Sequence, residues 1–515
     1  MTKVERILQI LISIACMIPL FVVTFITVRY NVFVTDGGSE VVNVAHVPAV
    51  LYAVVLVLIV LLLCDRILNR IDSGTFLGVG LFFFAVCGLY LVFNADSFLR
   101  ADSLFCFQAA GNINAGDFSD FKAGGYVNVY PFQLGWITIE RIMLRFSSNI
   151  TFFYFCFLVI SILTILVLWL ISREICRRND VQNITLMLSL AFLPHLFNTL
   201  FVYGNVPGYL LFLTAVYFQI RSLRHDRTVY YVLAALLGVA AFVLKNNFEI
   251  GLVAMLGIYV LELILNPRNR KIYTAVALAL VLVPASSLVI ERCYSSESGM
   301  EVSLGSGIPK PAFIAMGMQE GNGRYGWYND YTLKTYRKEG HDSSRTSAVA
   351  ERELKKRVRY FGNHPGYARK FYVNKLVSTW GDSLHESVWN GPLDSCGARM
   401  YTDVMKWIYH PDTAVHRRLH YFTKIIEMMV MIFTLVATVG LAFGRRHDTA
   451  VIYVMLSIVY FTGGFLFHLM WETKAQYTYQ YVSMLIPSAA LGIVMCREKV
   501  GILIDRMIFR LKNRR

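Results

Sequence analysis

The sequence predicts an all-α integral membrane protein with about twelve transmembrane helices, external juxtamembrane helices and one large external loop. Three observations support this fold class: 56% of the 515 residues are hydrophobic, only 16% are charged, and the mean hydropathy is +0.51. Soluble domains carry about a quarter charged residues. The composition therefore excludes an ordinary soluble globular protein.

The apolar residues fall into runs that are each close to the ~20 residues needed to cross a bilayer. Lys3 and Arg6 stand in front of the first run, which is too long for a signal-peptide core and has no clear small-residue cleavage site, so we expect it to be retained. The runs lie at about residues 7–29, 47–64, 76–94, 150–171, 183–201, 207–220, 229–244, 248–265, 272–290, 421–443, 449–470 and 477–495.

The basic residues predict the orientation. If the N-terminus is cytoplasmic, Lys and Arg should collect after every second span. They do so at Arg66 and Arg70, at Arg173, Arg177 and Arg178, at Arg221, Arg224 and Arg227, at Arg268, Arg270 and Lys271, at Arg445 and Arg446, and in the tail. The net charge of +15 therefore indicates membrane orientation and not nucleic-acid binding. We expect a multi-pass membrane protein with both termini cytoplasmic.

Spans and loops divide the chain into six segments. They are N-terminal transmembrane helices (1–93), an external loop with juxtamembrane helices that carries the candidate chemistry (94–149), central transmembrane helices (150–290), a large external loop (291–420), C-terminal transmembrane helices (421–496) and a basic cytoplasmic tail (497–515). The 9 cysteines contain no C-x-x-C spacing. Cys293 and Cys396 share the large loop, and the sequence leaves a disulfide between them open.

The external segment 94–149 contains carboxylates next to hydrocarbon. A charged group is energetically costly in that position, so its presence favours a functional role. Residues 101–115 predict a short helix that ends at Gly116. Pro131 suits the first turn of the next helix. Asp102 then lies at a helix start, where the backbone dipole favours its charged form. An ionised carboxylate there can accept a proton from a hydroxyl, although a helix N-terminal residue without chemistry is the alternative.

Two lysines contradict the charge rule because they stand at the external ends of spans. Lys245 and Lys474, close to acidic and aromatic residues, indicate a site for an anion. Arg369 and Lys370 lie in segment 367–380, which predicts either a helix in the headgroup plane or the solvated face of a small cap. For these two residues, contact with lipid headgroups is the alternative to anion binding.

The order and sidedness of several motifs resemble the GT-C glycosyltransferases that use polyprenyl-phosphate sugars. This class includes the bacterial lipid A aminoarabinose transferases and the protein O-mannosyltransferases. The similarity covers most of the chain from Phe93 to Pro487. The matching positions are Asp102, Ala109-Ala110, Gly116-Asp117, Tyr130-Pro131, Tyr203-Gly-Asn-x-Pro-Gly208, Leu244-Lys-Asn-Asn247, Ala315-Met-Gly317, Gly326-Trp-Tyr-Asn329 and Trp471-Glu-x-Lys-x-x-Tyr477.

This resemblance implies the transfer of a sugar, with inversion, from a polyprenyl phosphate to an extracytoplasmic glycan, lipid or protein. Asp102 would be the general base, a role that supplies about 10²–10⁴-fold. Lys245, Lys474, Arg369 and Lys370 are the candidates for binding the donor phosphate. Asp96 would assist Asp102 or bind a divalent cation, with a polar span end as its alternative; no cofactor and no metal site is assigned.

The aromatic and acidic neighbours have weaker assignments. Tyr126, Tyr130 and Glu472 are candidates for contacting the sugar or the acceptor. An interfacial aromatic belt would give the two tyrosines the same composition, and Glu472 could instead pair with one of the external lysines.

The chain also departs from the family pattern. The aminoarabinose transferases have a Lys-Pro-Pro whose Lys contacts the donor phosphate, and here Val129, Tyr130 and Pro131 occupy those places. A transporter or lipid-linked sugar flippase is one alternative function, but the spans divide as nine and three and not as two sixes. A polysaccharide polymerase or ligase, acting through Arg369 and His364, is another.

Overall fold

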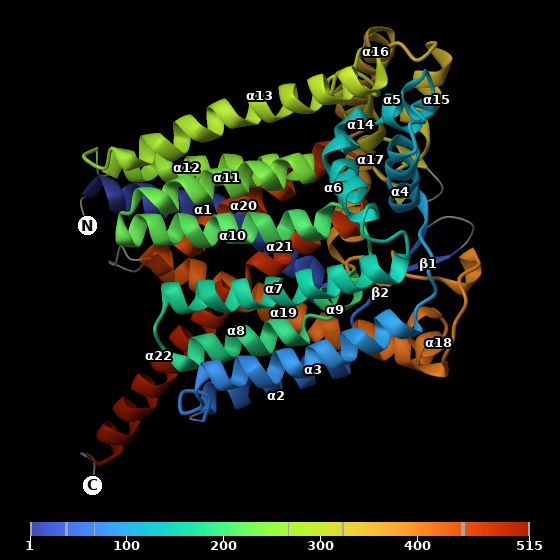
Figure 1. Ribbon diagram of the computed structural model, residues 1–515. Helices are drawn as coiled ribbons and strands as arrows, with labels where there is room; N and C mark the ends of the chain where they lie inside the picture. The colour runs from blue at the N-terminus through green and yellow to red at the C-terminus, as the bar shows by residue number, and fades with distance from the viewer. Residues whose placement is uncertain are drawn as a thin grey trace.

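The computed structural model describes residues 3–36, 40–65, 67–265, 267–321, 324–443 and 449–512. Long, roughly parallel helices form a bundle, and short helices and loops cover one of its ends (Figure 1). We call this covered end, which carries residues 95–149 and 299–413, the loop end. The opposite end, where the connections 65–72, 176–178, 226–227 and 267–270 lie, is the basic end. The predicted all-α membrane fold is confirmed.

The predicted apolar runs all lie in helices. The long helices are α1 (Lys3–Arg29), α2 (Ala49–Cys64), α3 (Ser73–Asn94), α7 (Ile150–Ile175), α8 (Asn179–Ala191), α10 (Asn205–His225), α11 (Thr228–Leu244), α12 (Glu249–Leu265), α13 (Lys271–Ser298), α19 (Ala414–Phe443), α20 (Thr449–Met470) and α22 (Ile486–Lys512).

Fewer helices than expected satisfy the criteria of length and apolar composition for a span. Within the described ranges 7 satisfy them, or up to 9 if two bent pairs each count as one span. One pair joins α8 to α9 (Pro194–Phe197) and a following turn at 56°, and the other joins α21 (Tyr479–Met484) to α22 at 47°. Of the twelve expected spans, α2 and α11 have 16 and 17 residues and are shorter than the criterion requires. The more polar α10 is the third that does not reach it.

Short helices form the loop end. They are α4 (Ala101–Asn114), α5 (Tyr126–Val129), α6 (Leu134–Leu144), α14 (Lys310–Gly317), α15 (Tyr331–Lys338), α16 (Ser343–Asn363), α17 (Pro365–Trp380) and α18 (Asp403–Tyr409). The expected helix at 101–115 is α4. α17 was expected either in the headgroup plane or as the solvated face of a small cap, and it differs from both. Its Phe371, Val377 and Trp380 are buried, and the Trp380 ring packs on Phe461 of α20 at 5.1 Å.

Two pairs of strands were not expected. β1 (Tyr30–Asp36) and β2 (Glu40–His46) form an antiparallel hairpin between α1 and α2. Its β-branched residues favour the extended strand conformation. The Val32 N–H donates a hydrogen bond to the Gly381 carbonyl at 3.1 Å. A second, very short pair is β3 (Glu320–Gly321) with β4 (Arg324–Tyr325). The hairpin thereby attaches the N-terminal part of the chain to the large loop.

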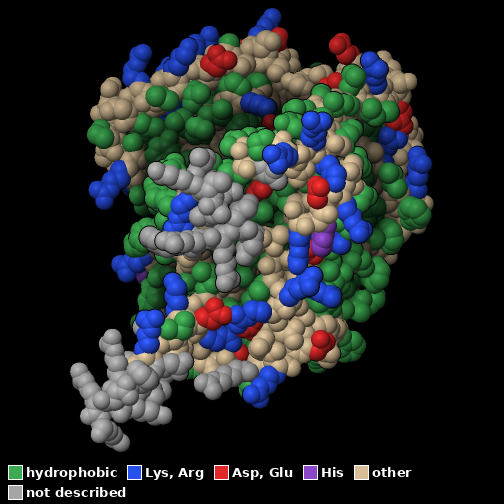
Figure 2. All heavy atoms as spheres, turned by 90° about the vertical axis from the view of Figure 1, so that its left-hand side faces the viewer, with side chains coloured by type: hydrophobic (Ala, Val, Ile, Leu, Met, Phe, Trp, Pro, Cys, Tyr) green, Lys and Arg blue, Asp and Glu red, His purple; other side chains and the backbone are tan. Residues whose placement is uncertain are grey.

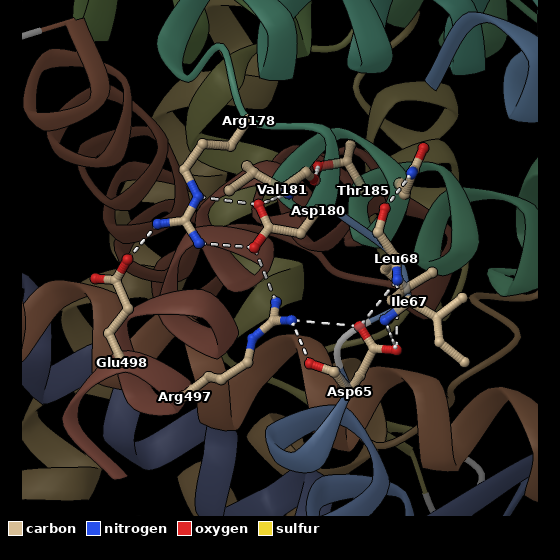
Figure 3. Close-up of polar contacts among 10 residues, drawn as sticks. Asp65, Ile67, Leu68, Arg178, Asp180, Val181, Thr185, Arg497 and Glu498 are labelled. Carbon is tan, nitrogen blue, oxygen red and sulfur yellow. Dashed lines mark hydrogen bonds and ion pairs between the residues drawn. The ribbon is translucent and has the colours of Figure 1, made fainter. Parts of the chain in front are cut away.

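Arginine and lysine side chains predominate over acidic ones on the basic end, which faces the viewer in Figure 2. Some of them are fixed in ion pairs. The guanidinium of Arg178 donates to both oxygens of Asp180, and Arg497 joins Asp180 to Asp65 at 3.2 and 3.3 Å (Figure 3). These contacts hold the α2–α3 connection, the start of α8 and α22 together. Of the predicted basic clusters, Arg66, Arg445, Arg446, Arg514 and Arg515 lie outside the described residues.

The question of a disulfide in the large loop is answered. The described Cys293 and Cys396 are not joined by a disulfide.

Candidate active site

The centre of the candidate site is Asp102, which stands in the first turn of α4 and is exposed. The residue before it, Ala101, has a φ of 49°, in the left-handed region that a side chain with a Cβ rarely adopts. Asp102 Oδ1 accepts a hydrogen bond from the Tyr126 hydroxyl at 3.1 Å, and Oδ2 accepts one from Tyr203 at 3.2 Å. Two phenols from different segments therefore fix this carboxylate.

Tyr203 connects Asp102 to a buried lysine. Its hydroxyl accepts hydrogen bonds from Lys245 Nζ and from Gln133 Nε2, both at 2.6 Å. The ammonium of Lys245 also lies 3.9 Å from the centre of the Tyr203 ring. A Cβ added to Gly204 would stand 2.6 Å from the Leu244 carbonyl oxygen, so this close approach of the two segments requires glycine.

Burial strongly affects the charge of Lys245. The side chain is 8% exposed, and its burial lowers its pKa from 10.5 to about 8, although the charge of Asp102 acts in the opposite direction. Lys245 thus lies behind Tyr203 and close to Asp102. It follows the last residue of α11, which agrees with the expected position at a span end, and its role in binding phosphate stays a prediction.

The second predicted lysine belongs to an ion-pair cluster. Lys474 pairs with Glu40 of the hairpin, and Glu40 pairs with Arg324 of β4 at 3.0 Å. Burial opposes ionisation of Glu40, but the charges of Lys474 and Arg324 outweigh it and lower the pKa of this carboxyl to about 2. Glu386 holds the adjacent backbone, because its Oε1 accepts hydrogen bonds from Ala475 N at 2.7 Å and Gln476 N at 3.3 Å.

Glu472 interacts electrostatically with both of these groups of residues. It is 6% exposed, and its carboxylate forms no hydrogen bond within the part of the chain that the structure describes. Burial raises its pKa to about 7, opposed by Lys474 and Lys375 and supported by the charge of Asp102. Glu472 is therefore within electrostatic reach of both Asp102 and Lys474.

Aromatic rings line the site near Asp102. The rings of Tyr126 and Tyr130 are 5.3 Å apart. Burial and then the charge of Asp102 raise the pKa of the Tyr130 hydroxyl, so this phenol is a neutral hydrogen-bonding group. The structure thus brings five predicted residues into one region, namely Asp102, Tyr126, Tyr130, Lys245 and Glu472, with Lys474 beside Glu472.

Other candidates lie elsewhere or make different contacts. Asp96 uses both carboxylate oxygens to hold the large loop, accepting from Arg399 N at 2.9 Å and from the Tyr401 hydroxyl at 3.0 Å. Arg369 and Lys370 are exposed on α17. Among the described residues, no three His, Cys, Asp or Glu side chains are placed to hold a metal ion.

Several residues of the site were missed from the sequence. Gln133, Glu40, Arg324 and Glu386 carried no recognised signal, whereas the motif that contains Tyr203 was noticed without a role. Lys375 was taken for a surface residue; it is 1% exposed and donates to the carbonyls of Gly317, Leu469 and Trp471 at 2.6, 3.0 and 2.8 Å. An alternation of basic and apolar residues does not reveal which face of a helix is covered.

Comparison with known protein families gives a match over part of the chain. Residues 130–290 match the family model described as dolichyl-phosphate-mannose-protein mannosyltransferase. No curated protein matches the chain. The matched range begins at Tyr130 in the site and contains Gln133, Tyr203 and Lys245. Together with the apolar helices, the match supports a polytopic membrane glycosyltransferase of the GT-C type.

Proposed function

We propose that this glycosyltransferase moves a sugar from a polyprenyl-phosphate donor to a hydroxyl of an extracytoplasmic glycan, lipid or protein, with Asp102 as the general base. The observation that carries the proposal is the exposed Asp102 carboxylate, oriented by the hydroxyls of Tyr126 and Tyr203 with the ammonium of Lys245 behind them. A positioned carboxylate that remains accessible can receive a proton from a bound substrate.

The reaction follows from this arrangement. The acceptor oxygen attacks the anomeric carbon, its proton passes to Asp102, and the bond from that carbon to the phosphate oxygen breaks. Attack on the face opposite the leaving phosphate inverts the configuration. Each oxygen of Asp102 already accepts one hydrogen bond from a tyrosine, which leaves further lone pairs for the substrate. General-base catalysis of this kind contributes about 10²–10⁴-fold.

The phosphate and the sugar need separate contacts. Lys245 and Lys474 are the favoured cations for the phosphate. Lys245 interacts electrostatically with Asp102. Glu472 interacts electrostatically with both Asp102 and Lys474. Arg369 and Lys370 are exposed on α17, which suits headgroup contact better. Tyr126, Tyr130 and Glu472 would contact the sugar or the acceptor by hydrogen bonding and stacking.

The orientation supports an extracytoplasmic reaction. Lys and Arg gather on the basic end (Figure 2), which the positive-inside rule places in the cytoplasm. α1 begins and α22 ends on that side (Figure 1), so both chain ends would be cytoplasmic and the loop end would face outward, as in a bacterial plasma membrane.

The test is a transfer assay on the purified protein with a panel of polyprenyl-phosphate sugars. Asp102→Asn removes the proton acceptor and nearly preserves shape, so turnover should fall by at least ~10²-fold while the protein still inserts and binds donor. The matched control is Asp117→Asn, since Asp117 lies in the same loop and its carboxylate accepts hydrogen bonds from the neighbouring Ser119. Asp96→Asn tests the assisting role. Near-normal transfer by Asp102→Asn would refute the proposal.

A further inference from the structure

Two cations of the site are held side by side by the backbone. The Thr473 N–H donates to the Gly326 carbonyl at 2.9 Å, which joins the segment of Lys474 to the segment of Arg324. Arg324 is 5% exposed, and its Nε has no hydrogen-bond partner among the described residues. Without an anion, the buried Arg324 and the half-buried Lys474 would repel each other, so a negative group between them stabilises the arrangement.

Glu40 supplies that negative group from a separate element. One carboxylate oxygen pairs with Lys474, and the other accepts from Arg324 Nη1 at 3.0 Å. Glu40 begins β2 and pairs with Asp36 at the turn end of the hairpin, whereas Val32, closer to α1, is fixed to Gly381. Glu40 therefore stands at the end of the hairpin that lies farther from this backbone attachment.

We infer that Lys474 and Arg324 together form the binding site for the phosphate group of the donor, and that Glu40 occupies this site in the free protein. The inference rests on the proposed function, and it adds Arg324 and the hairpin to it. Carboxylate and phosphate oxygens suit the same planar guanidinium, which makes Glu40 an internal substitute for the ligand. Glu472, two positions before Lys474 in the sequence, interacts electrostatically with Asp102, so the anion site and the base belong to one region.

The two cations also suit the chemistry of the leaving group. When the bond from the anomeric carbon to the phosphate oxygen breaks, the phosphate gains a negative charge. Preorganised cations aimed at that charge lower the barrier without rearranging at the moment of reaction. Glu40 keeps the pair compensated and fixed until a phosphate displaces it, so Glu40 competes with the ligand.

A binding measurement on the purified full-length protein tests this competition. The probe is geranyl phosphate, and geraniol is the control without charge. Glu40→Gln removes the competing anion and should bind the probe about tenfold more tightly. Lys474→Ala and Arg324→Ala should each bind it about tenfold more weakly. Glu320→Gln is the matched control, because Glu320 lies in the neighbouring strand β3 and accepts from the Tyr367 hydroxyl instead.

Hydrogen–deuterium exchange of the wild-type protein gives a second measurement that needs no variant. Geranyl phosphate should increase exchange in β2 and leave the α8 peptides at the basic end unchanged. Unchanged or lower affinity of a folded Glu40→Gln protein, or unchanged exchange in β2 at saturation, would overturn the inference and leave the proposed function intact. Absence of binding to the wild-type protein would overturn the phosphate donor itself, and this inference with it.

Discussion

The hydroxyl of Tyr203 donates a hydrogen bond to Asp102 Oδ2 at 3.2 Å, and two other residues fix the direction of this hydroxyl. Lys245 and Gln133 both donate to the same hydroxyl oxygen at 2.6 Å. A phenol oxygen that accepts two such bonds can direct its own proton only to a third partner. Lys245 therefore acts on Asp102 through Tyr203, which orients the carboxylate and favours its charged form.

The first prediction concerns this connection. Tyr203→Phe removes the donor to Asp102 and leaves the buried Lys245 without its hydrogen-bond acceptor. We expect turnover to fall about tenfold or more, and the free energy of unfolding to fall by about 1–3 kcal/mol. Transfer kinetics and thermal unfolding measure the two effects.

Tyr126→Phe is the matched comparison, because Tyr126 donates to the other oxygen of Asp102 and makes no contact with Lys245 in the described structure. It should lower turnover with a smaller loss of stability. Equal stability losses for the two variants would contradict the role given to Lys245.

The second prediction is a pH dependence that originates in Lys245. Burial lowers its pKa from 10.5 to about 8 in the folded protein. Between these values the unfolded chain binds more protons than the folded one, so this group's contribution to stability increases with pH. Its positive charge disappears over the same window, and binding of geranyl phosphate should weaken as the pH rises above about 8. Lys245→Met should abolish both trends, measured by unfolding and binding between pH 7 and 10. A variant that keeps the wild-type binding profile would contradict the assignment.

Local signals were enough to predict the part of the site around Asp102. A helix start, a glycine stop and an interfacial proline depend on a few neighbouring residues, and α4 begins and ends where they indicate. The partners of Lys474 could not be found in this way. Glu40 is 434 positions from Lys474 in the sequence, and their contact depends on a hairpin whose strands had been read only as a connection between spans.

The apolar runs predicted the helices better than they predicted the spans. Every run is helical, but periodicity cannot reveal a bend such as the one of 56° between α8 and α9. Lys375 shows the same limit for packing, since three backbone carbonyls that it contacts come from α14 and the end of α20. Such contacts become visible only once the elements are assembled.

The third prediction concerns Glu472. Burial raises its pKa from 4.5 to about 7, so the folded protein binds more protons than the unfolded chain between these values. The stability that this group contributes is present below about pH 4.5 and is lost as the pH rises through about 7. Glu472→Gln stays neutral, so it should be more stable than the wild type at pH 8, by about 1 kcal/mol or more.

The same variant should lower transfer about tenfold if the ionised carboxylate binds a sugar or acceptor hydroxyl. Thermal unfolding at pH 5 and pH 8, with kinetics at pH 8, measures both effects. A stability difference that does not change with pH would contradict the role of burial.

The last prediction concerns the backbone that presents the base. Ala101 has a φ of 49° directly before Asp102, a conformation that costs an L-residue with a Cβ about 1–2 kcal/mol. Such strain is retained where it serves a site, and here it turns the chain from the extended Arg100 into α4. Ala101→Gly relieves the strain, so the free energy of unfolding should rise by up to about 1 kcal/mol while turnover falls, because Asp102 is held less firmly. Ala101→Val keeps the Cβ and adds branching, so it should destabilise by more than about 1 kcal/mol. Denaturant unfolding and transfer kinetics compare the three proteins, and a glycine variant less stable than the wild type would show that the left-handed residue is not strained.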